Sequence, residues 1–149
     1  MGLRRQSREA ALQILYLADI ARLKADRAAA IIWAGADYPP KAQHFADILA
    51  SGALSHQAEI DLLITKYADN WEISRMAAVD RNILRLAAFE ILTELDTPIS
   101  VVIDEAVEIA KTFSTVDSGK FVNGILDRIK ADRPALPPVS STDGQRELF

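Results

Sequence analysis

The chain has 149 residues, half of them hydrophobic and about a quarter charged, which is the composition of a globular protein with one compact core. It has no cysteine, no apolar run that could span a membrane and no signal-peptide pattern at its start, so a disulfide framework, a thiolate zinc site and a membrane protein are excluded, and we expect a cytoplasmic protein without a metal or cofactor. The net charge of −4 argues against a protein that coats nucleic acid without specificity.

The first part of the chain is expected to form three helices, because its apolar residues recur at intervals of three and four. The first helix spans residues 4–24, and a shorter one spans residues 25–34, where a glycine and a proline-containing turn end it. The third runs from about residue 42 to residue 68, with Gly52 as a candidate kink.

A connector and an almost wholly apolar helix follow. Within the connector, residues 69–78, Trp71 and Ile73 are expected to anchor the chain to the core. The helix over residues 79–94 has almost no polar face, which is typical of a helix at the centre of a core. The sequence leaves open whether this helix is buried within one chain or partly across a homodimer.

Two charged residues, Arg85 and Glu90, interrupt that apolar helix. A buried charge needs a partner. We therefore expect Arg85 to pair with a carboxylate of the segment 104–108 in the next helix.

Two amphipathic helices complete the predicted all-α domain, which spans residues 1–132 and shows no alternating strand pattern. Thr97 can cap the first of them, with Pro98 at its first position, and the helix over 98–114 places Phe113 inside. Either Asp117 or Ser118 can cap the last helix. Residues 133–149 contain three prolines and are expected to form a flexible tail.

The sequence contains no recognisable catalytic pattern. The six glycines assemble neither a Walker loop nor a dinucleotide fingerprint, and no cysteine nucleophile is present. Asp104, Glu105 and Glu108 share the outer face of a helix, where solvated or ion-paired carboxylates are the expected interpretation rather than a catalytic pair.

Positive charge is concentrated at the start of the chain. Residues 1–30 contain six basic and three acidic side chains, a local net charge of +3 on an otherwise acidic protein. Arg4, Arg5 and Arg8 lie within one or two turns of helix and project near one another. Guanidinium groups grip phosphates well, so these arginines indicate a nucleic-acid contact. The alternative is a merely solubilising end of the chain.

The segment Gly119-Lys120-Phe121-Val122-Asn123-Gly124 also has two interpretations. Lys120 and Asn123 share a helix face, and an exposed Phe121 beside them would suit single-stranded RNA, because bases stack on aromatic rings. Alternatively, Phe121 packs in the core. Gly124 within a helix costs about 1 kcal/mol relative to alanine, which calls for close helix packing or a ligand that approaches the backbone.

Taken in order, several segments resemble the NusB family. They are residues 4–16, residues 80–87 with Glu90, Thr97-Pro98, residues 103–111 and residues 118–126. The match covers residues 4 to about 130. The resemblance implies an all-α fold of about seven helices in two small helical bundles.

The family resemblance also implies a function and partners. The function is transcription antitermination, especially of ribosomal RNA operons. The partners are NusE, which is also a ribosomal small-subunit protein, the single-stranded boxA element of nascent RNA, and RNA polymerase with NusA and NusG.

Site residues follow from the family match position by position. The arginine cluster would contact RNA phosphates, and further RNA-surface residues would be Lys120, Phe121, Asn123, Lys66 and Tyr67. Tyr16, Asp80 and Asp117 match positions near the partner-binding or RNA-responsive surface.

Two other functions remain as alternatives. Certain ribosomal RNA cytosine methyltransferases begin with a NusB-like domain, but a chain of 149 residues without cysteine lacks the catalytic part. The other alternative is a helical interaction protein that does not bind RNA.

Overall fold

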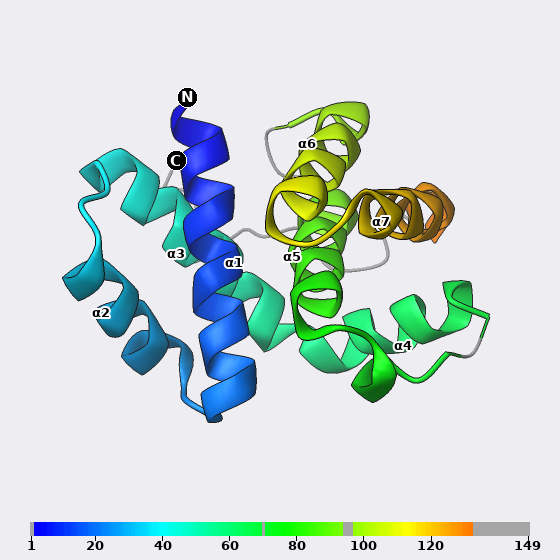
Figure 1. Cartoon of the computed structure of the whole chain (residues 1–149), viewed down its shortest axis with the longest axis horizontal. Helices are drawn as coiled ribbons and strands as arrows, with labels where there is room; N and C mark the ends of the chain where they lie inside the picture. Colours follow the sequence, from blue (N-terminus) through cyan, green and yellow to red (C-terminus); the bar gives the residue numbers. More distant parts are fainter. Residues whose placement is uncertain (1, 70, 94–96, 133–149) are drawn as a thin grey trace.

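The computed structural model describes residues 2–69, 71–93 and 97–132, and these residues contain seven α-helices, two short 3₁₀ turns and no strand (Figure 1). The helices are α1 (Leu3–Ala21), α2 (Ala25–Gly35), α3 (Pro40–Ser55), α4 (Gln57–Tyr67), α5 (Ala78–Thr93), α6 (Ile99–Phe113) and α7 (Val116–Ile129). The all-α prediction is therefore confirmed. The predicted tail over residues 133–149 lies outside the described residues. None of the described helices is long and apolar enough to cross a membrane.

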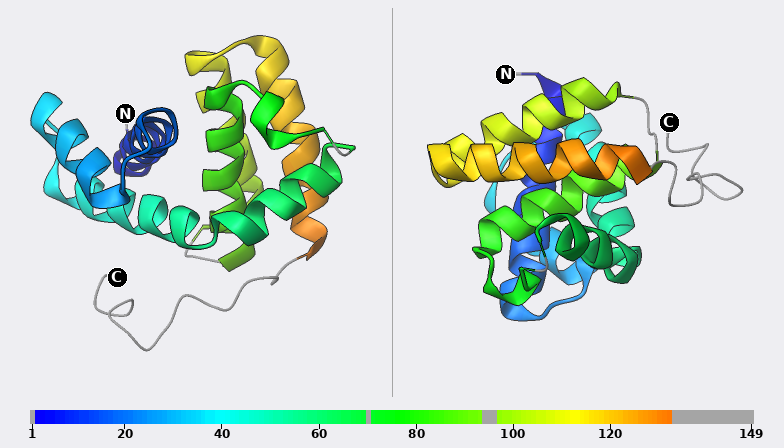
Figure 2. Two further views of the ribbon diagram at one scale, coloured as in Figure 1. Left: turned by 90° about the horizontal axis from the view of Figure 1, so that it is seen from below. Right: turned by 90° about the vertical axis from the view of Figure 1, so that its right-hand side faces the viewer.

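The helices form two small bundles, as the family resemblance implies (Figures 1 and 2). In the first, α1 packs on α2 and α3; in the second, α5, α6 and α7 pack together with α4 beside them. Helix α5 also contacts α1 and α3, so a single hydrophobic core runs through both bundles.

Helix α5 lies at the centre of this core. Thirteen of its sixteen residues are buried, including polar ones such as Asn82 and Thr93. These residues are covered by other helices of the same chain. The interpretation of residues 79–94 as a central helix is correct, and its burial requires no second copy.

The prediction of one helix over residues 42–68 is wrong at its middle. The chain breaks at His56, which ends α3 and precedes α4, and Gly52 stays within α3. Gly52 lies instead where α3 crosses α5, because a Cβ atom at this position would overlap the buried ring of Phe89. The His56 ring stacks over the same phenyl ring, with 6.0 Å between centroids.

Two helix starts differ from the prediction by a residue or two. Pro98 is the residue before α6 rather than its first residue. Helix α7 is capped by Thr115, whose hydroxyl accepts a hydrogen bond of 3.0 Å from the Ser118 backbone N–H. The prediction that Asp117 or Ser118 provides this cap is therefore wrong, because the helix begins earlier, at Val116.

The prediction for the partner of Arg85 is also wrong. Its guanidinium donates to both carboxylate oxygens of Asp61 on α4, at 2.9 and 3.0 Å, and to Asp19 on α1 at 3.1 Å. The physical reason is that Arg85 lies on the face of α5 that meets α1 and α4, and not on the face that meets α6.

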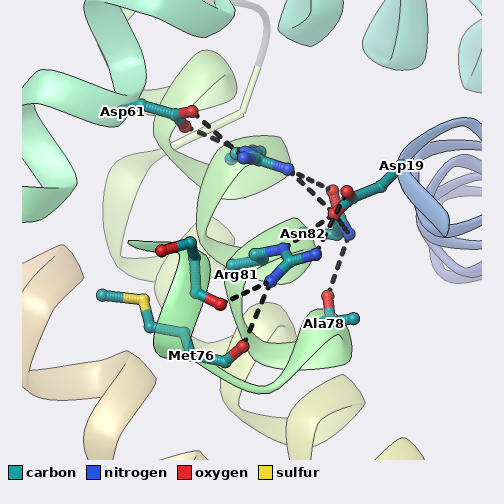
Figure 3. A network of polar contacts seen from close by, with 8 residues as sticks. Asp19, Asp61, Met76, Ala78, Arg81 and Asn82 are labelled. Carbon is teal, nitrogen blue, oxygen red and sulfur yellow. Dashed lines mark hydrogen bonds and ion pairs between the residues drawn. The ribbon is translucent and has the colours of Figure 1, made fainter. Parts of the chain in front are cut away.

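Asp19 is the centre of that network (Figure 3). It also accepts hydrogen bonds from Arg81, at 2.7 and 3.1 Å, and from Asn82 at 2.9 Å. Burial alone would raise the pKa of Asp19, but the hydrogen bonds from Arg81 and Asn82 outweigh burial, and the pKa lies below its ordinary value. The charged network thus joins α1, α4 and α5.

Candidate nucleic-acid interface

The three arginines at the start of α1 have different environments. The Arg8 side chain is 5% exposed and forms a two-pronged pair with Glu90 of α5, with donor–acceptor distances of 2.9 and 2.8 Å. The Glu90 side chain is only 1% exposed. A phosphate cannot reach a guanidinium buried in this way without breaking the pair, so we assign Arg8 a structural role.

Arg5 lies closer to the surface and is also paired. Its guanidinium donates to both oxygens of Glu105 on α6, at 2.5 and 2.7 Å. The Arg5 and Glu105 side chains are 28% and 22% exposed. The hydrogen bonds from Arg5 hold the pKa of the Glu105 carboxyl below its ordinary value of 4.5. Glu105 therefore stays charged near neutral pH and competes with any phosphate for Arg5.

This pair leads to a pH-dependent prediction. Glu105→Gln is expected to lower the free energy of unfolding by about 1 kcal/mol or less at neutral pH. Because the folded state lowers the pKa of Glu105, the stabilisation is complete above about pH 4.5 and is lost as the pH falls through the lowered value. Urea unfolding at several pH values measures the difference between wild type and variant.

The matched control is Glu108→Gln, because the Glu108 side chain is 52% exposed and pairs with Lys111, whose side chain is 42% exposed. Its effect should be smaller at every pH. A difference for Glu105→Gln that does not shrink as the pH is lowered would contradict the assignment of its stabilising effect to the ion pair.

Arg4 is the exposed member of the cluster. Its guanidinium lies 3.9 Å from the centroid of the Phe45 ring, which holds the side chain against α3. Arg4 and Arg5 line a surface hollow together with Thr97 and Val101. The exposed guanidinium of Arg4 therefore lies at this hollow, beside the paired guanidinium of Arg5.

A second hollow lies between α6 and α7. Lys120 and Asn123 are exposed and line it from α7, while Asp104 and Glu108 line it from α6. The two side chains from α7 therefore do share a face, as their spacing predicts. The mixture of ammonium, amide and carboxylate groups offers hydrogen-bond donors and acceptors for base edges.

Gly124 belongs to the same exposed face of α7. It is an exposed residue, and a Cβ atom added to it would meet nothing within 4 Å. Close helix packing therefore does not account for this glycine. It does account for Gly119, where an added Cβ would lie 3.0 Å from the Lys111 side chain.

Phe121 is half-buried, which answers the question that the sequence left open. One part of the ring packs against the hydrophobic core, and its edge meets the indole of Trp71, with 6.4 Å between centroids and 62° between planes. Ile73 also packs against the core, as expected. Trp71 does not: it is 55% exposed, so the prediction that it anchors the connector is wrong.

Lys66 and Tyr67, at the end of α4, lie near this aromatic pair in the fold because α4 packs against α7. The Lys66 ammonium is 4.9 Å from the centroid of the Tyr67 ring. The Tyr67 carbonyl accepts a hydrogen bond of 2.9 Å from Arg128 of α7. Lys66 and Tyr67 thus adjoin the α7 surface, whereas Arg4 and Arg5 lie across α6 from it.

Tyr16 lies apart from both hollows. It is 40% exposed on α1 and lines an apolar groove with Leu12, Ile31 and Phe113. The amphipathic pattern predicts that Phe113 faces inward, but it is 41% exposed and borders this groove. Phe113 is the last residue of α6, and the last buried residue of that helix is Ala110.

Asp80 and Asp117 occupy different environments at the starts of their helices. Asp117 is exposed in the first turn of α7. Asp80 is buried in the first turn of α5, where its Oδ2 atom accepts a hydrogen bond of 3.0 Å from the Ser118 hydroxyl. Asp80 therefore joins the start of α5 to the start of α7 and is not exposed to a partner. Within the described ranges, no group of three or more acidic, histidine or cysteine residues could hold a metal ion.

Comparisons with known proteins agree with this geometry. The model of the NusB family matches residues 5–131. The transcription antitermination protein NusB of Elusimicrobium minutum (strain Pei191) is 46% identical over 145 residues, which cover 89% of this chain and 96% of that protein.

Two solved structures have the same fold. NusB of T. maritima is 42% identical, with a TM-score of 0.78, and the alignment covers 87% of this chain and 92% of that one. A chain in a crystal structure of the antitermination factors NusB and NusE in complex with double-stranded RNA is 28% identical, also with a TM-score of 0.78, over 87% of this chain and 96% of that one.

Proposed function

The chain belongs to the NusB family, and from this we propose that it is a transcription antitermination factor. In this proposal it binds boxA-type single-stranded RNA together with NusE. The complex joins NusA, NusG and RNA polymerase in the cytoplasm and supports processive transcription of ribosomal RNA operons. The protein acts as an adaptor and not as an enzyme.

The observation that carries the RNA part of the proposal is the position of α6 between two hollows. Its residues Val101 and Glu105 line the hollow of Arg4 and Arg5, and Asp104 and Glu108 line the hollow of Lys120 and Asn123. An RNA strand that crosses α6 would meet guanidinium groups on one side and a polar face with an ammonium, an amide and carboxylates on the other.

The two sides suit different parts of a nucleotide. Arg4 and Arg5 offer positive charge to phosphates, although Arg5 must exchange Glu105 for a phosphate oxygen. Carboxylates beside Lys120 and Asn123 repel phosphates but can accept hydrogen bonds from base amino groups. We therefore place phosphates at the start of α1 and bases at α7.

The partner NusE is proposed to bind at the apolar groove of Tyr16. Exposed Ile31 and Phe113 border this groove, and it lies apart from both hollows. Apolar surface of this kind is a common feature of protein interaction sites. Asp117 is exposed and can contribute to a partner contact, whereas Asp80 would act only by fixing the start of α7.

The proposal is tested by titrating fluorescently labelled boxA RNA with the full chain, with and without NusE, at two salt concentrations. The double variant Arg4→Ala/Arg5→Ala is expected to bind more weakly, with a salt dependence whose slope falls by about 0.7 for each phosphate that the variant no longer neutralises. Circular dichroism of the double variant checks that its helical fold is unchanged.

A matched control makes the same change in net charge at a different place on the protein. Arg22→Ala/Arg27→Ala removes two exposed arginines from the same basic part of the chain and should leave RNA affinity nearly unchanged. If both double variants lost the same affinity, Arg4 and Arg5 would contribute only nonspecific electrostatic attraction and not a specific contact. No binding by the wild type, even with NusE, would overturn the proposed function.

The same titration tests the partner groove. Tyr16→Ala is expected to reduce the gain in affinity that NusE provides and to leave RNA binding without NusE unchanged. Gel filtration of the wild type at several concentrations shows whether a second copy occupies the groove instead. A concentration-dependent dimer that Tyr16→Ala abolishes would contradict the assignment of the groove to NusE.

A further inference from the structure

Trp71 is an exposed aromatic residue that the backbone holds in place. Its N–H donates a hydrogen bond of 3.0 Å to the carbonyl of Ala68, and Asp69 between them adopts a left-handed conformation with φ of 55°. Ala68 is buried on one side of this turn, and Ile73 packs against the core on the other. The turn is thus anchored at both ends while the indole is 55% exposed.

The contact with Phe121 places the indole at the edge of the α7 surface. The two rings meet edge to face, with 6.4 Å between centroids. Phe121 also packs against the hydrophobic core, which holds the ring that the indole contacts in place. More than half of the Trp71 surface remains open to a flat ligand.

Two exposed lysines belong to α4, which precedes Trp71 in the sequence, and to α7, which contains Phe121. Lys120 directly precedes Phe121 and is exposed, and Lys66 is exposed at the end of α4 beside Tyr67. Among the described residues, neither ammonium group has a carboxylate within ion-pair distance. Proteins that bind single-stranded nucleic acid combine exposed aromatic rings, on which bases stack, with positively charged side chains elsewhere on the same surface.

We propose that Trp71, supported by Phe121, is a stacking platform for one unpaired base of single-stranded RNA. The inference rests on the proposed RNA-binding function and extends the binding surface from α7 to the connector after α4. An unpaired base is required because bases within a duplex already stack on one another and present no open face.

The first experiment uses the indole itself as the probe. The chain has two tryptophans, and Trp33→Phe leaves Trp71 as the only one. Titration of this variant with single-stranded boxA RNA, in the presence of NusE, is expected to quench the Trp71 emission. The same RNA annealed to its complement should quench it much less. Unchanged emission while the anisotropy of labelled RNA rises would overturn the inference and leave the proposed function standing.

The second experiment measures affinity. Trp71→Ala is expected to weaken RNA binding by about 5- to 150-fold, the range for removing one stacked base. Trp71→Phe should recover most of the affinity. The factor should be similar at low and high salt, because stacking releases no counterions, whereas the effect of Arg4→Ala/Arg5→Ala depends on salt.

The matched control is Leu62→Ala, because Leu62 is a 74% exposed aliphatic residue of α4. It should leave RNA affinity unchanged. Wild-type affinity in Trp71→Ala would overturn the inference, as would a loss of NusE binding without any loss of RNA binding. If the wild type itself binds no RNA, the proposed function and the inference fail together.

Discussion

Replacing Glu90 by glutamine is expected to lower the free energy of unfolding by about 3–5 kcal/mol, the cost of leaving a buried charge without its partner. Glutamine keeps the volume of the side chain but not its charge, and the guanidinium of Arg8, at 5% exposure, then has only the more distant carboxylate of Glu105, at 3.9 Å, to offset its charge. The expected decrease is a large part of the stability of an ordinary domain. Urea unfolding followed by circular dichroism measures the change as a lower midpoint.

Two further variants isolate the buried pair. Glu105→Gln breaks the chemically similar but partly exposed pair with Arg5 and should cost far less. The double variant Arg8→Met/Glu90→Leu removes both charges together and should be much more stable than Glu90→Gln. A decrease below about 1 kcal/mol in Glu90→Gln would show that the pair is more hydrated than its burial indicates.

Gly52→Ala is expected to destabilise the protein by about 1–3 kcal/mol, because the new methyl group overlaps the ring of Phe89 at the crossing of α3 and α5. The ring is 1% exposed, so it is enclosed by the core on all sides. For a domain of this size the expected fall in melting temperature is about 2–4 °C per kcal/mol. Thermal unfolding measures it.

The control uses the same substitution on another helix. Gly124→Ala introduces a methyl group that meets nothing within 4 Å, so the higher helix propensity of alanine should stabilise the protein by up to about 1 kcal/mol. In the Gly52→Ala background, Phe89→Leu should restore part of the stability because the smaller side chain vacates the overlap. Melting temperatures that change in the same direction for both glycines would contradict the packing role of Gly52.

Much of the fold could be predicted from the sequence because hydrophobic periodicity reports which face of a helix is covered. The nearly apolar α5 proves central, and the amphipathic patterns of α6 and α7 are confirmed except at Phe113. The break at His56 could not be predicted, because the periodicity continues through it.

The candidate site was less predictable, because its charges select partners that are distant in the sequence. The sequence offers Arg85 several possible carboxylate partners. Asp19 and Asp61 are its partners because α5 packs against α1 and α4. Helical spacing places Arg8 beside Arg4 but cannot show that Arg8 is buried against Glu90. The exposure of Trp71 could not be predicted, because an isolated tryptophan is more often buried than exposed.

The ion pairs between α1 and α5 also have a consequence for cooperative binding. Ion pairs join helix α1 to α5 at two places. Arg8 pairs with Glu90, and Asp19 pairs with Arg81 and Arg85. The two attachments are eleven residues apart, roughly 16 Å along a helix axis. Arg4, which lines one hollow, and Tyr16, which lines the apolar groove, are both residues of this helix.

A helix fixed in this way is preorganised for binding. Neither NusE nor RNA has to order α1 on binding, so neither pays an entropic cost for doing so. Any mutual enhancement between NusE and RNA would then have to arise where the two ligands touch each other or share a surface. It would not arise from a change of shape in this chain. Hydrogen exchange along α1 should consequently be as slow in the free protein as in the ternary complex.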